Sequence, residues 1–425
     1  MFGFMMKKVM NVGQAADMLA VSKETLRRWD NSGKLIARRH PISGYRVYEE
    51  NELKQLNLPN LEDTDEQLDH QLSRPIRTYK SVELFAGAGG LALGFEAAGF
   101  ECQLLSEIDK NACATLRKNR PDWNVAEGDV GNINFTSFRG KVDVITGGFP
   151  CQAFSYAGKK LGFSDARGTL FYEFARAIKE VQPIIAIGEN VRGLISHDGG
   201  KTIQGMSTIL EEIGYRVISP KVLKAIHFKV PQKRERLFLI AIRKDVLVDF
   251  NYPKPKNTIY TLSDALKRGR LFSIDAPISA GQDYPVKKKE IMKLVPPGGY
   301  WRDLPVDIQK EYMKKSYYLT GGRTGIARKI SWDEPSLTLT CAPAQKQTER
   351  CHPDFNRPFT VREYARIQTF PDIWEFSGSL TSQYKQIGNA VPVNLAFSVA
   401  QSVVDFLNRH NEKLTPSNEG NKKRK

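Results

Sequence analysis

We predict that residues 80–245 of this 425-residue chain form a doubly wound α/β domain, for three reasons. Short apolar runs typical of buried strands alternate with helical patterns, as in a parallel sheet with helices on both faces. A glycine-rich turn joins the first apolar run to the first helical pattern. The length and a hydrophobic content of 41% suffice for more than one core. The expected strands are 81–85, 103–106, 142–146, 184–188 and 236–242, and the expected helices between them are 91–98, 111–119 and 169–181.

The composition changes on both sides of this domain. A basic block and then an acidic run with few apolar residues come before it. After it the alternation is lost and Pro, Gly and Lys increase, until helical patterning returns at 361–368 and 393–407. We expect a small N-terminal domain (1–58), an acidic linker (59–79), the α/β domain (80–245), a smaller irregular region (246–356), a C-terminal part that returns to the α/β domain (357–410) and a basic disordered tail (411–425).

The net charge of +16 favours a polyanionic partner, and nucleic acid is the first candidate. Five cysteines without a short repeated spacing argue against a disulfide scaffold. The lack of a Cys-x-x-Cys pair argues against a thiolate zinc site, and we expect no metal. Because no apolar run approaches the roughly 20 residues of a membrane helix, we expect a cytoplasmic protein with no membrane partner.

The turn after the first strand has the spacing of a nucleotide-binding loop. Gly87, Gly89 and Ala92 fit the pattern Gly-x-Gly-x-x-Gly/Ala, in which glycine lets a ligand approach the backbone. Glu107 closes the second strand, where a carboxylate can accept hydrogen bonds from ribose, and Asp129 lies near the end of a third. Read alone, these residues suggest a dinucleotide site, and the alternative is a glycine turn with helix-capping acids.

A cysteine follows the strand at 142–146 in a Gly/Pro loop, 147–155, which we call the nucleophile loop. Cys151 lies at the carboxyl end of that strand, where α/β enzymes place their chemistry. A free thiol has a pKa near 8.5 and needs help to act as a thiolate. The alternative, a small buried hydrophobe, suits Cys102 and Cys113 in predicted core elements better than Cys151.

Charged residues adjoin two other predicted strands. Glu189 follows the apolar run 184–188, and desolvation there would raise the pKa of its carboxyl. Arg234 and Arg236 precede the strand at 236–242, where alternation places both on one face. The alternatives are a surface glutamate paired with an arginine and two solvated arginines.

Six segments in this order resemble the DNA cytosine-5 methyltransferases of bacterial restriction–modification systems, from about Lys80 to Leu407. Any one of them is weak, but the ordered set is specific. They are Phe85-Ala86-Gly87-Ala88-Gly89-Gly90, Gly148-Phe149-Pro150-Cys151-Gln152, Glu189-Asn190-Val191, Gln232-Lys233-Arg234-Glu235-Arg236, Arg362-Glu363-Tyr364-Ala365-Arg366-Ile367-Gln368 and Gln386-Ile387-Gly388-Asn389-Ala390-Val391-Pro392.

The resemblance implies a Rossmann-like domain that binds S-adenosylmethionine instead of a dinucleotide. It implies that Glu107 binds the ribose, that Asp129 binds the adenine amino group and that Phe85 lies against the adenine or methionine part. The full set of implied cofactor residues is Phe85, Gly87, Ala88, Gly89, Gly90, Glu107, Ile108, Asp129, Val130, Pro150, Leu170, Asn389 and Val391.

The resemblance also implies the reaction. Cys151 would attack carbon 6 of a cytosine flipped out of duplex DNA, and Glu189 would share a proton with ring nitrogen 3. Arg236 would contact the base, and Arg234 would support the loop or the DNA backbone. Residues 246–356 would be the target-recognition region, with basic residues such as Lys288 and Lys329 meeting phosphates, and roughly 152–167 a mobile lid.

In a bacterial cell such an enzyme would protect host DNA, with a cognate endonuclease that is functionally linked but not stably bound. It would be associated with the nucleoid. Methylation of RNA and an inactive scaffold of a transcription factor are the competing hypotheses, and the intact motifs argue against the scaffold.

The N-terminal block resembles the winged helix-turn-helix of mercury-resistance-type regulators and excisionases. Residues 12–19 read as a first helix, Ser22 as the cap of a second, and 44–48 as part of a β-wing. We expect this domain to bind DNA, and we hypothesise that the promoter of its own operon is its target. The alternative is a domain for packing on the enzyme or for dimerisation. Its candidate DNA-binding residues are Arg27, Arg28, Arg38, Arg39 and Arg46.

Overall fold

The computed structural model describes residues 9–18, 26–27, 30, 35–40, 44–55, 72–150, 169–319 and 323–414. The chain divides into two compact units. One comprises residues 1–72 with 254–258, and the other comprises 73–253 with 259–425. Cys151, Arg28, Ser22, the expected lid at 152–167, most of the acidic linker and the tail beyond Leu414 lie outside the described residues.

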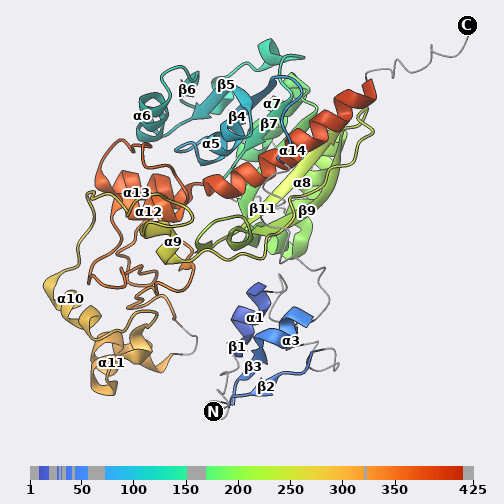
Figure 1. Ribbon diagram of the computed structural model, residues 1–425. Coiled ribbons are helices and arrows are strands. Elements are labelled where there is room, and N and C mark those ends of the chain that lie inside the picture. The colour runs from blue at the N-terminus through green and yellow to red at the C-terminus, as the bar shows by residue number, and fades with distance from the viewer. Residues whose placement is uncertain are drawn as a thin grey trace, which may run out of the picture. The chain divides into compact units, whose positions relative to one another are not determined.

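A seven-stranded sheet in the order β6-β5-β4-β7-β8-β11-β9 forms the centre of the larger unit (Figure 1). The first five strands in this order are parallel neighbours. β11 runs antiparallel to both β8 and β9, so the sheet is mixed and the expected all-parallel sheet is wrong at this edge. The strands are β4 (Tyr79–Leu84), β5 (Phe100–Glu107), β6 (Val125–Glu127), β7 (Val144–Gly147), β8 (Ile185–Val191), β9 (Tyr215–Lys224) and β11 (Glu235–Arg243).

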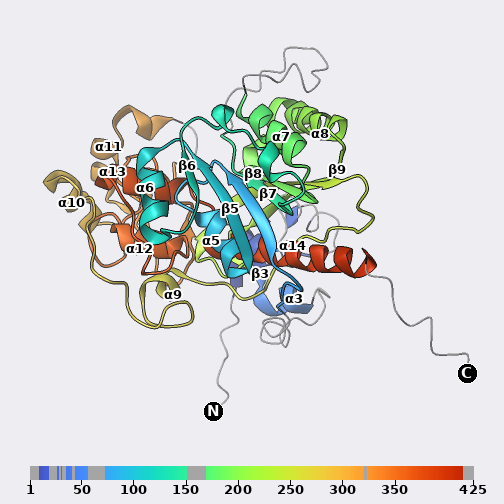
Figure 2. The same ribbon diagram turned by 90° about the horizontal axis from the view of Figure 1, so that it is seen from above.

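Helices cover both faces of the sheet, as predicted for a doubly wound domain (Figure 2). On one face, α5 (Gly90–Ala97) and α14 (Val393–Leu414) bury Leu91, Phe95 and Val403 in a core with β4, β7, β8 and β11. On the other face, α7 (Leu170–Val181) and α8 (Lys201–Glu212) bury a second core. α6 (Lys110–Asn119) follows β5.

A third apolar cluster joins the C-terminal elements to α5 and to the region 246–356. It involves α12 (Val361–Ile367), α13 (Leu380–Asn389) and α9 (Leu262–Leu266). Residues between 284 and 351 bury a further cluster around Trp301. The remaining elements of this unit are α10 (Val286–Lys293), α11 (Val306–Met313), β10 (Gln232–Lys233), β12 (Ser336–Leu337) and the 3-10 helices Val130–Asn132, Thr136–Phe138, Arg192–Gly200, Ala225–His227, Trp301–Asp303 and Lys314–Tyr318.

Two expected boundaries differ from the structure. Tyr79, placed in the linker, is fully buried as the first residue of β4. α14 continues through Leu414, four residues into the expected tail, because its apolar face packs on the sheet. Within the described residues, Leu380–Leu414 is one stretch long and apolar enough to cross a membrane, and 61% of its most apolar part is buried, as in a core helix.

In the described part of the smaller unit, the strands form the sheet β1-β3-β2 and the helices α1 and α3 lie beside them in sequence. Its core is built from Ala15, Ala16, Leu26, Leu35, Tyr48 and Leu53. The first helix and the antiparallel strands of the wing lie where the sequence places them. The elements are β1 (Val9–Asn11), α1 (Val12–Met18), β2 (Arg38–Arg39), β3 (Arg46–Glu49) and α3 (Glu50–Gln55).

Candidate active site

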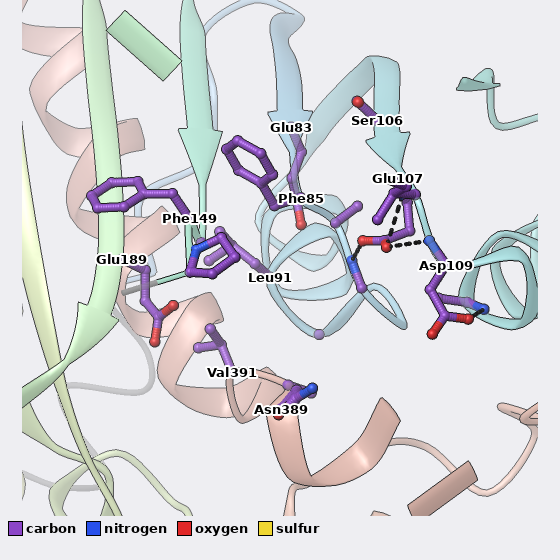
Figure 3. A pocket seen from close by; sticks show the side chains of 18 of the residues that line it. Glu83, Phe85, Leu91, Ser106, Glu107, Asp109, Phe149, Glu189, Asn389 and Val391 are labelled. Carbon is purple, nitrogen blue, oxygen red and sulfur yellow. Dashed lines mark hydrogen bonds between the residues drawn. The ribbon is translucent and has the colours of Figure 1, made fainter. Parts of the chain in front are cut away.

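A cavity of about 600 Å³ opens at the carboxyl ends of the parallel strands β4, β5 and β7 (Figure 3). Ligands of doubly wound folds bind at this edge of the sheet. Five of the six sequence segments contribute to its wall, together with residues from β5 and the turn after β6. The cavity brings together eleven of the predicted cofactor residues, which are Phe85, Gly87, Gly90, Glu107, Ile108, Asp129, Val130, Pro150, Leu170, Asn389 and Val391.

The carboxylate of Glu107 is held by backbone donors. The Gly87 N–H donates to its Oε2 at 2.7 Å. The N–H groups of Ile108 and Asp109 donate to its Oε1 at 2.9 and 2.7 Å. Each carboxylate oxygen has two acceptor sites, so this arrangement fixes the side chain and leaves one site, on Oε2, for a ribose hydroxyl.

Because Gly90 has no side chain, the glycine loop can approach the segment 386–392 closely. A Cβ atom on Gly90 would lie 2.3 Å from the carbonyl oxygen of Val391, a separation that real Cβ atoms do not show. Val391 and Asn389 line the cavity beside this contact. A side chain at residue 90 would therefore push one cavity wall away from the other.

Two predicted cofactor residues do not line the cavity. Ala88 is 1% exposed and belongs to the core beneath the loop. Gly89 caps α5 with a φ of +84°, and a Cβ there would meet Leu116 at 2.8 Å. Gly89 is therefore needed for the turn and its packing, because the left-handed conformation suits glycine. Their contact with a ligand stays a prediction, because neither is among the residues that line the cavity.

The composition of the wall fits an adenosine group with a short charged side chain. Ile108 lies at the rim and is 69% exposed, which offers an apolar face for a flat base. Asp129 supplies an acceptor in the same wall, while one of its oxygens accepts from the Gly131 N–H at 2.8 Å. Phe85 has a φ of +59°, which is unfavourable for a non-glycine residue, and it lies between the glycine loop and Phe149.

The opposite end of the cavity contains a buried ion pair. Arg236 Nε lies 2.7 Å from Glu189 Oε1, and both side chains are about nine-tenths buried. Burial raises the pKa of the Glu189 carboxyl, although the positive charges of Arg236 and Arg234 oppose the shift. A carboxyl with a raised pKa, fixed by an arginine, can donate or share a proton with a bound base near neutral pH.

Arg234 does not lie in the cavity wall. It is 1% exposed and donates to the carbonyl oxygens of Leu339 at 3.3 Å and Gly388 at 2.9 Å. It falls between β10 and β11, so strand alternation does not place it beside Arg236. These contacts agree with the expected support of its loop, while the alternative contact with the DNA backbone stays a prediction. Arg234 ties three segments together and is a positioning residue.

Asn190 fixes the start of the nucleophile loop. Its Nδ2 donates to the carbonyl oxygen of Phe149 at 2.8 Å, and its Oδ1 accepts from the Val191 N–H. Pro150 lines the cavity immediately before Cys151, which lies outside the described residues. Burial raises the pKa of Cys102 to about 12, of Cys113 to about 11 and of Cys351 to about 12, so these thiols stay protonated at neutral pH.

Sequence reasoning missed several residues of the wall. Glu83, Asp109, Asn190 and Lys385 all line it, and Lys385 Nζ lies 3.2 Å from Asp109 Oδ2 across the cavity. Asn190 belongs to the segment Glu189-Asn190-Val191, so the motif itself could have identified it as a residue of the site. Glu83 had only the weak signal of an acid in an otherwise apolar strand.

The expected contacts with DNA stay a prediction. In the region 246–356, Lys288 pairs with the buried Glu349 at 2.6 Å and Lys329 is 5% exposed, so neither side chain is placed to meet a phosphate. Within the described residues there is no group of three or more His, Cys, Asp or Glu side chains that could hold a metal ion.

In the smaller unit, Arg27 and Arg39 are exposed. Arg38 pairs with Glu49 and Glu52, and Arg46 pairs with Asp30 at 2.5 Å. These two arginines therefore also hold the wing to the rest of its unit.

The fold and the site define an α/β enzyme that binds a nucleoside-type ligand beside a buried carboxyl–guanidinium pair. Residues 79–405 match the family described as C-5 cytosine-specific DNA methylase, and residues 11–48 match the MerR family of regulatory proteins. The chain therefore belongs to the C-5 cytosine-specific DNA methylase family, which confirms the resemblance read from its motifs.

Relatives of known class agree with this family. The chain is 58% identical to Type II methyltransferase M.Eco47II of Escherichia coli, over 96% of this chain and 98% of that protein. It is 31% identical to M.HhaI of Haemophilus parahaemolyticus, over 77% and 94%. A solved DNA modification methyltransferase from an E. coli prophage shares the fold, with a TM-score of 0.56 and 24% identity over 78% of this chain and all of that one.

Proposed function

We propose that this enzyme transfers a methyl group to carbon 5 of cytosine within a short duplex sequence, through a covalent adduct on Cys151. The buried pair of Glu189 and Arg236 beside Pro150 is the observation that carries this proposal. A candidate proton donor and a fixed positive charge thus line the same cavity as Pro150, the residue that precedes the thiol. S-adenosylmethionine, held along the wall from Glu107 to Val391, supplies an electrophilic methyl group when it is bound.

The chain's own residues act on the base in sequence. The Cys151 thiolate forms a bond to carbon 6, and the ring electrons move toward nitrogen 3, where Glu189 provides a proton. Carbon 5 then takes the methyl group from the sulfonium donor, which leaves as a neutral thioether, and gives its own proton to solvent water. Glu189 takes back the proton of nitrogen 3 as the bond between carbon 6 and the Cys151 sulfur breaks, which restores the aromatic ring. Arg236 holds Glu189 and the base, and Asn190 holds the loop that carries the thiol.

The base must leave the stacked duplex to reach this buried pair, at a cost of a few kcal/mol. We propose that residues 246–356 offset this cost through contacts with DNA. The relatives are Type II methyltransferases, which supports a role in protecting host DNA in a restriction–modification system at the bacterial nucleoid.

The test is incubation of the full-length protein with labelled S-adenosylmethionine and unmethylated genomic DNA, with Cys151→Ala as the control. Sequencing then maps the methyl marks. We expect 5-methylcytosine at one short motif, absent with the control. Label in RNA instead of DNA, or equal label with the control, would overturn the proposal.

A second function is proposed for the smaller unit, which matches MerR regulators over residues 11–48. We propose that it binds the promoter of its own operon through exposed side chains that include Arg27 and Arg39. The full-length double variant Arg27→Ala/Arg39→Ala should bind upstream DNA at least about tenfold more weakly, with its methylation rate within about twofold of the wild type. Equal loss of both properties would assign the unit to catalysis instead.

A further inference from the structure

One buried acid of the cavity has no part in the proposed reaction. Glu83 lies on β4, is 4% exposed and lines the cavity. None of the described Lys, Arg or His side chains forms an ion pair with it. Ionising an acid that is buried without a cation costs several kcal/mol. Since Glu83 lines a binding cavity, a positively charged group of the ligand could stabilise its ionised form.

The surroundings of Glu83 favour the neutral form of its carboxyl over the charged form. The hydroxyl of Thr146 on β7 is its hydrogen-bond partner. Among the described residues, the titratable groups that act on it are Glu107 at the end of β5, Glu189 on β8 and the Cys102 thiol of β5, and none of these three can carry a positive charge. Burial and the two neighbouring carboxyls raise the pKa of Glu83 well above its usual range.

Glu83 lies where the proposed orientation of the cofactor would put its sulfur atom. Figure 3 shows Glu83 between Glu107 on one side and Glu189 on the other. The sheet order β5-β4-β7-β8 requires the same arrangement. In S-adenosylmethionine the sulfur is bonded to the ribose and carries the methyl group. With the ribose at Glu107 and the acceptor base at Glu189, the positively charged sulfur falls between them.

We infer that Glu83 is the counter-ion of the cofactor's sulfonium group and gives up its proton when S-adenosylmethionine binds. The inference rests on the proposed function, because it takes the orientation of the cofactor from it. The product, S-adenosylhomocysteine, keeps the ribose and the amino acid but has a neutral sulfur. Glu83 therefore keeps its proton with the product, and this side chain distinguishes cofactor from product by charge.

The sign of the pH dependence follows from this linkage. Binding favours the ionised form of Glu83, so the pKa of Glu83 falls when the cofactor is bound. Between the bound and free pKa values, the dissociation constant for S-adenosylmethionine decreases about tenfold per pH unit as pH rises, since about one proton leaves. The dissociation constant for S-adenosylhomocysteine does not follow this dependence.

The test is isothermal titration calorimetry of the full-length protein at neutral pH, in two buffers that differ in ionisation enthalpy. The buffer dependence of the heat gives the number of protons released. We expect about one proton with S-adenosylmethionine and none with S-adenosylhomocysteine. Glu83→Gln should release none with either compound and lose the pH dependence. Glu349→Gln, which removes another buried carboxyl outside the cavity, should release protons as the wild type does.

Three results would overturn the inference: equal proton release with both compounds, no release from the wild type, or release that persists in Glu83→Gln. If the wild type binds S-adenosylmethionine and methylates DNA without releasing a proton, only this inference fails. If the wild type binds no S-adenosylmethionine, the proposed function itself fails.

Discussion

Replacing Arg236 with methionine should destabilise the protein in a way that depends on pH. The substitution keeps much of the side-chain volume and leaves Glu189 buried without the cation that lies 2.7 Å from it. If Glu189 stays charged, an unpaired buried charge costs about 3–5 kcal/mol. If Glu189 takes up a proton, the cost at pH 7 is about 4 kcal/mol, because an unfolded glutamate has a pKa of about 4.3 and each unit is worth about 1.4 kcal/mol.

The same reasoning predicts how the destabilisation of Arg236→Met changes with pH. In the variant, the pKa of Glu189 is higher in the folded state than in the unfolded state. The free energy needed to keep Glu189 protonated in the folded protein is therefore small at low pH and larger at high pH. The loss of unfolding free energy should fall from about 4 kcal/mol at pH 7 to about 1 kcal/mol at pH 5. Urea unfolding at the two pH values, followed by tryptophan fluorescence, measures it.

A neighbouring ion pair provides the control. Arg192 and Glu235 lie at the ends of the same two strands, also 2.7 Å apart, but Arg192 is 65% exposed. Arg192→Met should therefore cost less than about 1 kcal/mol at both pH values. An equal loss at pH 5 and pH 7 for Arg236→Met, or a loss no larger than that of the control, would refute the argument that burial gives this pair its importance.

Three further substitutions test the site. Glu189→Gln should lower the single-turnover methylation rate by about 10²–10⁴ and change the cofactor dissociation constant by less than about threefold, since it removes the proton donor; a parallel loss of cofactor affinity would contradict this role. Gly90→Ala should weaken cofactor binding by about tenfold or more in calorimetry, because the new Cβ displaces Val391. Gly193→Ala is the control, since its Cβ meets nothing within 4 Å, and it should leave binding unchanged. Equal effects of the two variants would exclude the close contact at Gly90 as the cause. Asn190→Leu should slow adduct formation by about tenfold or more in rapid-quench assays, because the nucleophile loop loses its anchor, and an unchanged rate would show that this hydrogen bond does not position the thiol.

Local patterns were sufficient for the doubly wound core and for most of the cavity. Apolar runs located β4, β5, β7 and β8, and the glycine spacing located the loop at Gly87 and Gly90. These features depend on neighbours along the chain, which is why a sequence reveals them. The family resemblance then identified the ligand, because glycine spacing alone favoured a dinucleotide.

Features set by distant contacts were harder to predict. The direction of β11 depends on its pairing with β8 and β9, which alternation does not specify. Arg234 was misplaced because its partners, Leu339 and Gly388, lie more than 100 residues away. Gly89 was assigned to ligand contact although its packing against Leu116 explains the glycine.

The most direct measurement of the central claim uses DNA with 5-fluorocytosine at the mapped target. Fluorine replaces the proton that must leave carbon 5, so the thiolate cannot be expelled after methyl transfer and the adduct should persist. We expect the wild type, with S-adenosylmethionine, to form a protein–DNA complex that survives denaturation, with the DNA joined to Cys151 in the peptide map. A complex that also forms with Cys151→Ala, or methylation of ordinary target DNA without any such complex, would contradict the account.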